Sequence, residues 1–191
     1  GWLWRPHADY DDAATERADL ARATAAIETA TGQRPSGFFC RGGESPWTRA
    51  LLAEAGYVYT SNAFDDDLPY ADASGLTVLP YALDSNDMKF FHPNGFVRSA
   101  EMVEYVADAL DQLLEEAEHG RSAMLSIGFH LRITGRPARF RAVSAILSHL
   151  AALDGRIWRA RRIDIARHFA ATHPGGTARR DLHAVLQGDS R

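Results

Sequence analysis

The hydrophobic and polar positions of this chain follow two different periods, and each period predicts a different element. From Ser99 to Gly120, apolar side chains recur at spacings of three and four, which indicates one face of an α-helix. Short apolar runs between turn residues indicate buried strands instead. The expected strands are 37–40, 57–61, 76–83, 124–129 and 157–160, and the other expected helices are 13–31, 45–56, a segment that Pro137 opens, and 163–171.

The ends of these elements carry their own signals. Asp11 or Asp12 is placed to cap the first helix, and Ser45 followed by Pro46 is typical of an N-cap and a first helical position. The acidic segment 65–75 is predicted to be a loop, and the polar segment 175–191 a tail beyond a domain of residues 1–174. Because strands and helices alternate, the sequence predicts an α/β fold with a largely parallel sheet.

The composition narrows the class of protein. With 191 residues, 46% hydrophobic and 24% charged, the chain fits one ordinary globular domain. A net charge of -4 gives no general attraction to phosphate backbones, so we expect no nucleic acid partner. No apolar run reaches the roughly 20 residues that span a bilayer, and the first residues lack a signal-peptide pattern, so we expect no membrane and a cytoplasmic location. The single cysteine, Cys40, provides no internal disulfide.

Polar side chains follow four of the predicted strands. They are Arg41, Glu44 and Ser45; Asp65, Asp66 and Asp67; Asp84, Asn86 and Asp87; and His130, Arg132 and Arg136. Active sites of α/β folds are built at such strand ends, so His130 is the first candidate for chemistry. A histidine beside a carboxylate can donate a proton, and an arginine can stabilise negative charge. The alternatives are solvated acidic turns and a histidine that only hydrogen-bonds within its loop.

A metal site finds little support in the spacing of the histidines. No two of the eight histidines are four residues apart, the spacing that places two ligands on one helix face. Asp164 and His168 have that spacing, but an interaction on the helix surface explains this pair more simply.

Five segments together resemble the allantoinase-like branch of the polysaccharide deacetylase superfamily, across residues 1–174. They are TGQRPSGFFCRGGESPWTRALLAEAGYVY, SNAFDDDLPY, LPYALDSNDMKF, SIGFHLRITGRPARF and RRIDIARHFAATHP. The resemblance implies a NodB-type distorted (β/α) barrel and hydrolysis of carbon–nitrogen bonds other than peptide bonds. It also implies that Arg41 orients a catalytic carboxylate, that an aspartate of DSND (Asp84 or Asp87) tunes the histidine, and that His130 is the general acid.

The chain departs from the superfamily pattern in two ways. Metal-binding members carry His-x-x-x-His where this chain begins, and the register places Trp4 at the second histidine. Tryptophan cannot bind zinc, and the metal-independent branch shares this replacement, so the resemblance implies catalysis without a metal or another cofactor. His7 leaves zinc as the alternative. The family's opening strands and first aspartate motif are also missing, so we expect a partial barrel that exposes a strand edge.

The leading hypothesis is therefore a metal-independent amidohydrolase acting on a small polar substrate, a cyclic ureide such as allantoin. The missing aspartate, or Asp66 or Asp67 in its place, would activate water, and Arg41 with Arg132 would stabilise the oxyanion. Further substrate-binding candidates are Glu44, Ser45, Asn86 and Arg136. The alternatives are a metal-dependent deacetylase of N-acetylated sugars and an inactive half-domain. We expect a homo-oligomer or a complementing N-terminal half as partner, and an isolated chain that is inactive and self-associates.

Overall fold

The structure is a computed structural model, and it describes residues 5–174. The chain forms two compact units. Among the described residues, unit 1 contains 5–80 and 160–174, and unit 2 contains Tyr81–Arg159. The predicted tail, residues 175–191, and Trp4 lie outside the described residues.

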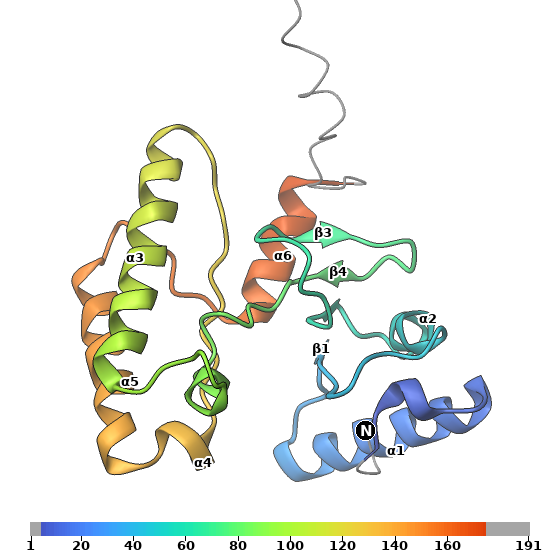
Figure 1. The fold of residues 1–191 in the computed structure, drawn as a ribbon. Coiled ribbons are helices and arrows are strands. Elements are labelled where there is room, and N and C mark those ends of the chain that lie inside the picture. The colour runs from blue at the N-terminus through green and yellow to red at the C-terminus, as the bar shows by residue number, and fades with distance from the viewer. Residues whose placement is uncertain (1–4, 175–191) are drawn as a thin grey trace, which may run out of the picture. The chain divides into compact units, whose positions relative to one another are not determined.

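Unit 1 is built around a four-stranded sheet in the order β1-β2-β4-β3 (Figure 1). The strands are β1 (Gly37–Phe38), β2 (Tyr59–Thr60), β3 (Tyr70–Ala71) and β4 (Thr77–Val78). The pairs β1–β2 and β2–β4 are parallel, and β3 is antiparallel to β4. The predicted α/β class with a largely parallel sheet is thus confirmed.

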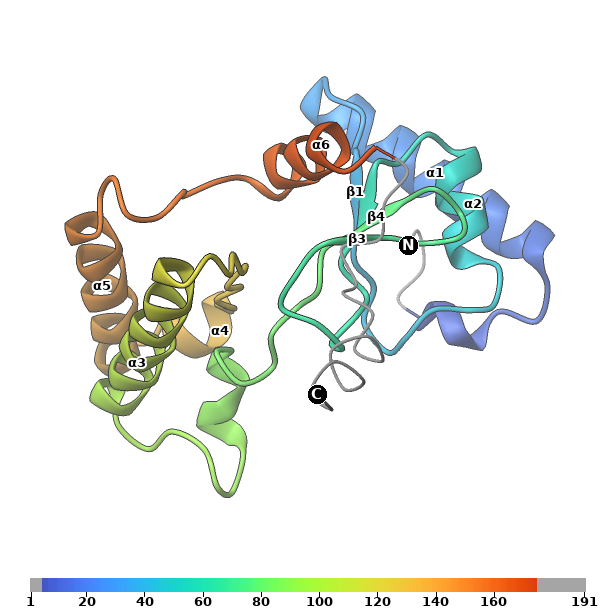
Figure 2. The same cartoon turned by 90° about the horizontal axis from the view of Figure 1, so that it is seen from above.

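The helices of unit 1 are the 3-10 helix η1 (His7–Asp9), α1 (Ala13–Thr31), α2 (Thr48–Glu54) and α6 (Arg162–Thr172). The Asp12 side chain accepts a hydrogen bond from the Thr15 backbone N–H at 2.8 Å, and α1 ends at Gly32 with a φ of 70°. Helix α1 packs against α2, and α6 packs against β4. Figure 2 shows the strands between α6 on one side and α2 on the other.

The core of unit 1 joins α1, α2 and the sheet. Its buried residues are Leu20, Phe38, Cys40, Leu51, Leu52, Tyr57 and Leu76. Strands β1 and β2 approach closely because Gly37 has no side chain, since a Cβ there would lie 1.9 Å from Cζ of Tyr59. Burial raises the pKa of the Cys40 thiol to about 11, so at neutral pH this cysteine is a protonated core residue.

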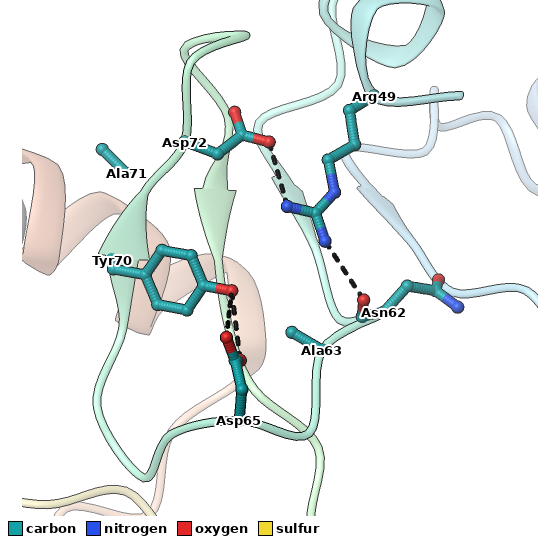
Figure 3. A pocket seen from close by; sticks show the side chains of 7 residues that line it. All are labelled: Arg49, Asn62, Ala63, Asp65, Tyr70, Ala71 and Asp72. Atoms are coloured by element: carbon teal, nitrogen blue, oxygen red, sulfur yellow. Dashed lines mark hydrogen bonds and ion pairs between the residues drawn. The ribbon is translucent and has the colours of Figure 1, made fainter. Parts of the chain in front are cut away.

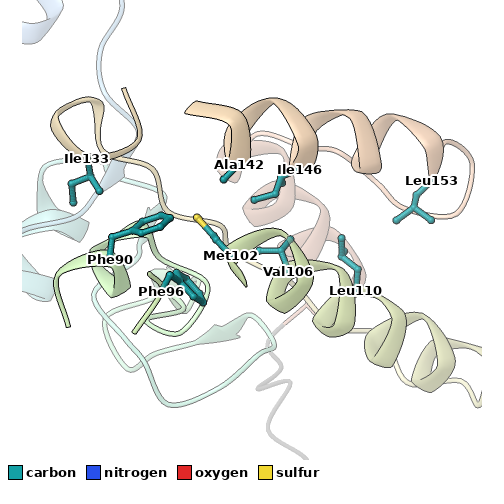
Figure 4. Packing of buried hydrophobic residues seen from close by; sticks show 9 residues of the cluster. All are labelled: Phe90, Phe96, Met102, Val106, Leu110, Ile133, Ala142, Ile146 and Leu153. Carbon is teal, nitrogen blue, oxygen red and sulfur yellow. The ribbon is translucent and has the colours of Figure 1, made fainter. Parts of the chain in front are cut away.

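Unit 2 contains the 3-10 helix η2 (Asp87–Phe91) and the helices α3 (Ser99–Glu118), α4 (Leu131–Thr134) and α5 (Pro137–Ala152). Helices α3 and α5 pack along each other. Figure 4 shows the core between them, where Met102 and Val106 of α3 face Ala142 and Ile146 of α5. The amphipathic pattern from Ser99 therefore predicted both the helix and the face that it buries.

Two predicted strands of unit 2 do not form. Within 124–129, only Gly128 bridges to Asn86, and within 157–160 only Ile157 bridges to Asp154. The apolar side chains of these segments pack against the α3–α5 core instead, as Leu125, Ile127 and Ile157 do. An apolar run indicates burial, but a strand also needs a neighbouring strand that pairs with its backbone over several residues. Each of these two segments pairs at one residue only.

Three further boundaries differ from the prediction. The predicted loop 65–75 contains β3, because the Asp72 carboxylate accepts from the Ser74 backbone N–H and closes a tight turn back to β4. Helix α2 begins at Thr48 instead of Pro46, since Oγ of Ser45 accepts from the backbone N–H groups of Trp47 and Thr48. Helix α4 lies where a loop was expected after His130.

No helix between residues 5 and 174 combines the length and the apolar character needed to cross a membrane.

The α3–α5 core can be tested with two adjacent residues of α5. Ile146 is 1% exposed and Leu147 is 57% exposed. Ile146→Ala should lower the free energy of unfolding by about 2–5 kcal/mol, because it leaves a cavity in the core. Leu147→Ala should change it by about 0.5 kcal/mol or less. Urea unfolding of the two variants provides the measurement, and equal losses would contradict the packing described.

Candidate active site

Asp87 and His130 of unit 2 form a hydrogen-bonded pair. Nδ1 of His130 lies 2.6 Å from Oδ1 of Asp87, and the backbone N–H of His130 donates to Oδ2 at 2.7 Å. The Asp87 side chain has no exposure to solvent, whereas the His130 side chain is 32% exposed. The ring is therefore held from its buried side and open on the other.

The segments that carry this pair approach closely because of particular residues. A Cβ on Gly128 would lie 2.2 Å from Nδ2 of Asn86, so only glycine fits beside this loop. The backbone N–H of Asp87 donates to the Gly128 carbonyl at 3.0 Å, and Oγ of Ser85 donates to the Ser126 carbonyl at 2.5 Å. These bonds fix the loop before η2 against the segment that leads to His130.

Helix α4 supplies a third member of the site, which the sequence analysis missed. Oγ1 of Thr134 donates to Oδ2 of Asp87 at 2.8 Å. One turn of helix places Ile133 and Thr134 on the buried side, while Leu131 is exposed. No sequence signal marked Thr134, because the segment was expected to be a loop.

The arrangement defines what His130 can do chemically. With the Asp87 carboxylate as acceptor, Nδ1 carries the hydrogen, and Nε2 is the ring nitrogen left for a substrate. When the ring is protonated, both nitrogens are donors. The aspartate fixes the tautomer and the orientation of the ring, which is the role of the carboxylate in a carboxylate–histidine pair.

The other predicted residues of unit 2 take different positions. Asp84 accepts a hydrogen bond from the Tyr105 hydroxyl at 2.9 Å, and this bond, with burial, raises the pKa of Tyr105. Asn86 caps η2 through the Met88 backbone N–H and donates to the Tyr81 hydroxyl. Of the two DSND aspartates, the one against His130 is thus Asp87.

The two predicted arginines of unit 2 are exposed. Arg132 lies on α4, with one guanidinium nitrogen 3.9 Å from Sδ of Met88. Arg136 is the residue that precedes α5. Both side chains belong to the segment just after His130.

The predicted residues of unit 1 differ in their exposure to solvent and in their contacts. Arg41 is exposed. Ser45 is buried, and Asp66 accepts from the Leu68 backbone N–H at 3.0 Å. Glu44 pairs with Arg49 at 2.8 Å, and Asp67 is half-buried.

A pocket of about 530 Å³ lies in unit 1 beside β3 (Figure 3). Arg49 pairs with Asp72 at 3.2 Å and donates to the Asn62 carbonyl, and the Tyr70 hydroxyl donates to Asp65 at 3.1 Å. Burial lowers the pKa of Arg49, but its bonds with Glu44 and Asp72 outweigh burial and raise it overall. Of the predicted polar groups, the pocket is lined by Asp65 and not by Asp66 or Asp67.

Unit 1 also holds a buried polar cluster that the sequence analysis did not predict. Glu16 of α1 accepts from Nδ1 of His7 at 2.7 Å, from Oγ1 of Thr48 at 2.5 Å and from Oγ of Ser45 at 2.5 Å. The ring of His7 lies edge-on to Tyr10 and to Phe38. In the sequence, Glu16 is indistinguishable from a surface position of an amphipathic helix.

The positions of the His, Cys, Asp and Glu side chains show whether the described residues could bind a metal ion. Among residues 5–174, no three His, Cys, Asp or Glu side chains are grouped so that they could hold a metal ion. His7, the residue considered for a displaced zinc ligand, is 1% exposed and is bound to Glu16.

Two of the known proteins that this chain resembles carry the name polysaccharide deacetylase. No protein-family model matches the chain. A Schizosaccharomyces pombe protein named "Putative polysaccharide deacetylase" is 38% identical over 128 residues, which cover 61% of this chain and 40% of that protein. The solved structure of a "probable Polysaccharide deacetylase" from Pseudomonas aeruginosa PAO1 is 40% identical, with a TM-score of 0.82, and covers 91% of this chain.

The chain is thus similar in sequence and structure to proteins named polysaccharide deacetylases. The solved structure of Puue allantoinase is a further neighbour, with 39% identity, a TM-score of 0.79 and coverage of 91% of this chain. The resemblance to polysaccharide deacetylases that the sequence predicted is confirmed, and one of the structural neighbours is an allantoinase. The neighbours are NodB-type deacetylases, which have a (β/α) barrel fold, as expected from the sequence. The chain spans 40% of the S. pombe relative and 58% to 59% of these two solved proteins.

The hydroxyl of Thr134 can be tested separately from its methyl group. Thr134→Val removes one donor from the buried Asp87 carboxylate and should lower the free energy of unfolding by about 1–3 kcal/mol. Thr134→Ser keeps the hydroxyl and should restore much of that loss. Denaturant unfolding of both variants gives the comparison, and a valine variant as stable as the unsubstituted protein would show that Asp87 does not need this bond.

Proposed function

We propose that the protein hydrolyses a carbon–nitrogen bond other than a peptide bond, with His130 as the proton donor. The observation that carries the proposal is the Asp87–His130 pair, in which a buried carboxylate orients a partly exposed imidazole. The homology to polysaccharide deacetylases and to an allantoinase, at 38% to 40% identity, supports the same class of reaction.

The proposed reaction uses His130 as the proton donor and several charged side chains for the other steps. A carboxylate takes a proton from the water molecule that attacks the carbonyl carbon, and the carbon–nitrogen bond breaks. The leaving nitrogen takes the proton that Nε2 carries when the His130 ring is protonated. Asp87 holds the ring in the orientation that presents Nε2. Arg41, together with Arg132, is proposed to stabilise the developing oxyanion, because a guanidinium carries a permanent positive charge. Asp66 and Asp67 are the carboxylates of this chain proposed for water activation.

For the substrate we propose a cyclic ureide such as allantoin, which would give the protein a role in ureide catabolism. The 39% identity to Puue allantoinase supports this choice. The second candidate substrate is an N-acetylated sugar, which the names of the S. pombe and P. aeruginosa relatives favour. Hydrolysis assays against allantoin and against N-acetylglucosamine oligomers distinguish the two.

The role of His130 predicts a large and specific loss of activity. General acid–base groups contribute about 10² to 10⁴-fold in rate. In the enzyme assembled with the expected N-terminal half, His130→Ala should therefore lower kcat on that scale while the protein stays folded. His119→Ala is the matched control, because His119 is an exposed histidine at the end of α3. Near-normal turnover of His130→Ala, or an equal loss in both variants, would sink the assignment.

We further propose that the reaction needs no metal. The protein should contain zinc only far below stoichiometry, and ureide hydrolysis should survive dialysis against a chelator. Metal analysis of the purified protein and the activity before and after chelation test this. Stoichiometric zinc whose removal abolishes activity would instead favour the deacetylase of N-acetylated sugars.

A further inference from the structure

The buried carboxylate of Glu16 joins three separate segments of unit 1. Its donors are His7 of η1, Ser45 and Thr48. Glu16 is 1% exposed. A buried carboxylate is expensive to desolvate and persists only where several donors meet it. An apolar side chain could fill such a place, so the carboxylate indicates a requirement for a defined geometry.

That geometry is the turn at the start of α2. Oγ of Ser45 donates to Glu16 and accepts from the backbone N–H groups of Trp47 and Thr48. Oγ1 of Thr48 donates to Glu16 and accepts from the backbone N–H of Ser45 at 2.9 Å. Each hydroxyl of the turn is thus oriented by the carboxylate.

The segment before this turn is fixed against η1. Gly42 and Gly43 have φ angles of 84° and 96°, which glycine adopts without strain. A Cβ on Gly42 would lie 2.8 Å from Cβ of Pro6, and the Ala8 backbone N–H donates to the Gly43 carbonyl at 3.2 Å. His7, between these contacts, is itself bound to Glu16.

On the other side of Arg41, Cys40 is held equally firmly. Its backbone N–H donates to Oδ1 of Asn62 at 2.8 Å, and its carbonyl accepts from Nδ2 of the same side chain at 2.7 Å. Arg41 therefore lies between two fixed segments of backbone. The first is Cys40, which Asn62 holds, and the second is the segment from Gly42 to Thr48, which depends on Glu16.

We propose that Glu16 is a positioning residue for the reaction, because its carboxylate fixes the turn from Gly42 to Thr48 and thereby the direction in which Arg41 leaves the chain. This inference rests on the proposed function of Arg41. Glu16 itself is buried and acts through Ser45, Thr48 and His7. A purely structural role of Glu16 would affect stability but would not depend on the Arg41 side chain.

Glu16→Gln is the most selective variant. If the amide oxygen keeps the bonds to His7 and Thr48, the amide nitrogen faces Oγ of Ser45, whose hydroxyl then loses its acceptor. The matched control is Glu28→Gln, which makes the same change on the surface of α1, where Glu28 pairs with Arg34 at 3.4 Å. Amide hydrogen exchange should speed up at Trp47 and Thr48 in Glu16→Gln and stay unchanged in Glu28→Gln.

The kinetic test is a double-mutant cycle with Arg41→Ala, assayed with allantoin and with N-acetylglucosamine oligomers. In the unsubstituted background, Glu16→Gln should lower kcat by about 10-fold to 100-fold, the scale of a displaced catalytic group. In the Arg41→Ala background the same change should lower kcat less than about 2-fold, within the error of additivity.

The outcomes separate this inference from the proposed function. Equal losses from Glu16→Gln in both backgrounds, or unchanged exchange at Trp47 and Thr48, would overturn the positioning role while leaving the hydrolase intact. If the chain assayed together with the expected complementing N-terminal half has no activity on either substrate, or if Arg41→Ala keeps full activity there, the proposed function of Arg41 is overturned, and with it the inference.

Discussion

The burial of the Asp87 carboxylate is the constraint on which the site in unit 2 depends. A carboxylate without solvent needs hydrogen-bond donors in place of water, and Asp87 receives them from the backbone and the ring of His130 and from the hydroxyl of Thr134. These donors come from a segment more than forty positions away, with sequence separations of 43 and 47. The close approach at Gly128 and the burial of Ile133 in the α3–α5 core follow from this requirement.

The same chemical pair occurs in unit 1 with a different consequence. His7 meets Glu16 through Nδ1 at 2.7 Å, as His130 meets Asp87 at 2.6 Å. Nε2 of His7 is buried and has no hydrogen-bond partner among the described residues, whereas the His130 side chain is partly open to solvent. A ring closed on every side can brace a turn, while a ring held from one side can exchange a proton with a bound molecule.

The sequence predicted the helices better than the strands, for a physical reason. Helix α1 was predicted with its observed bounds because its cap, Asp12, and its end, Gly32, act within a few residues. The segment 124–129 was wrongly predicted to be a strand, because an apolar run cannot report whether a distant backbone will pair with it. His130 was predicted from its position directly after that apolar run. The run does lead to His130 in the structure, although it forms no strand.

The partners of a site residue are harder to predict than the residue. The DSND motif offered two aspartates, and only the tertiary structure shows that Asp87 turns towards His130 while Asp84 turns towards Tyr105. Thr134 and Glu16 carried no signal, because a hydroxyl or a carboxylate on a short helix or a helix surface is ordinary.

Some acidic residues that were predicted to contact substrate instead bind partners within unit 1, which the local sequence could not show. Glu44 pairs with Arg49, which also pairs with Asp72, and Asp66 closes a turn through the Leu68 backbone N–H. Each of these carboxylates already satisfies a donor of its own unit, so binding a substrate would require it to give up or share that bond. His130 differs, since Asp87 engages one ring nitrogen and thereby directs the other. This asymmetry, more than the number of polar groups near a strand end, makes His130 the residue suited to proton transfer.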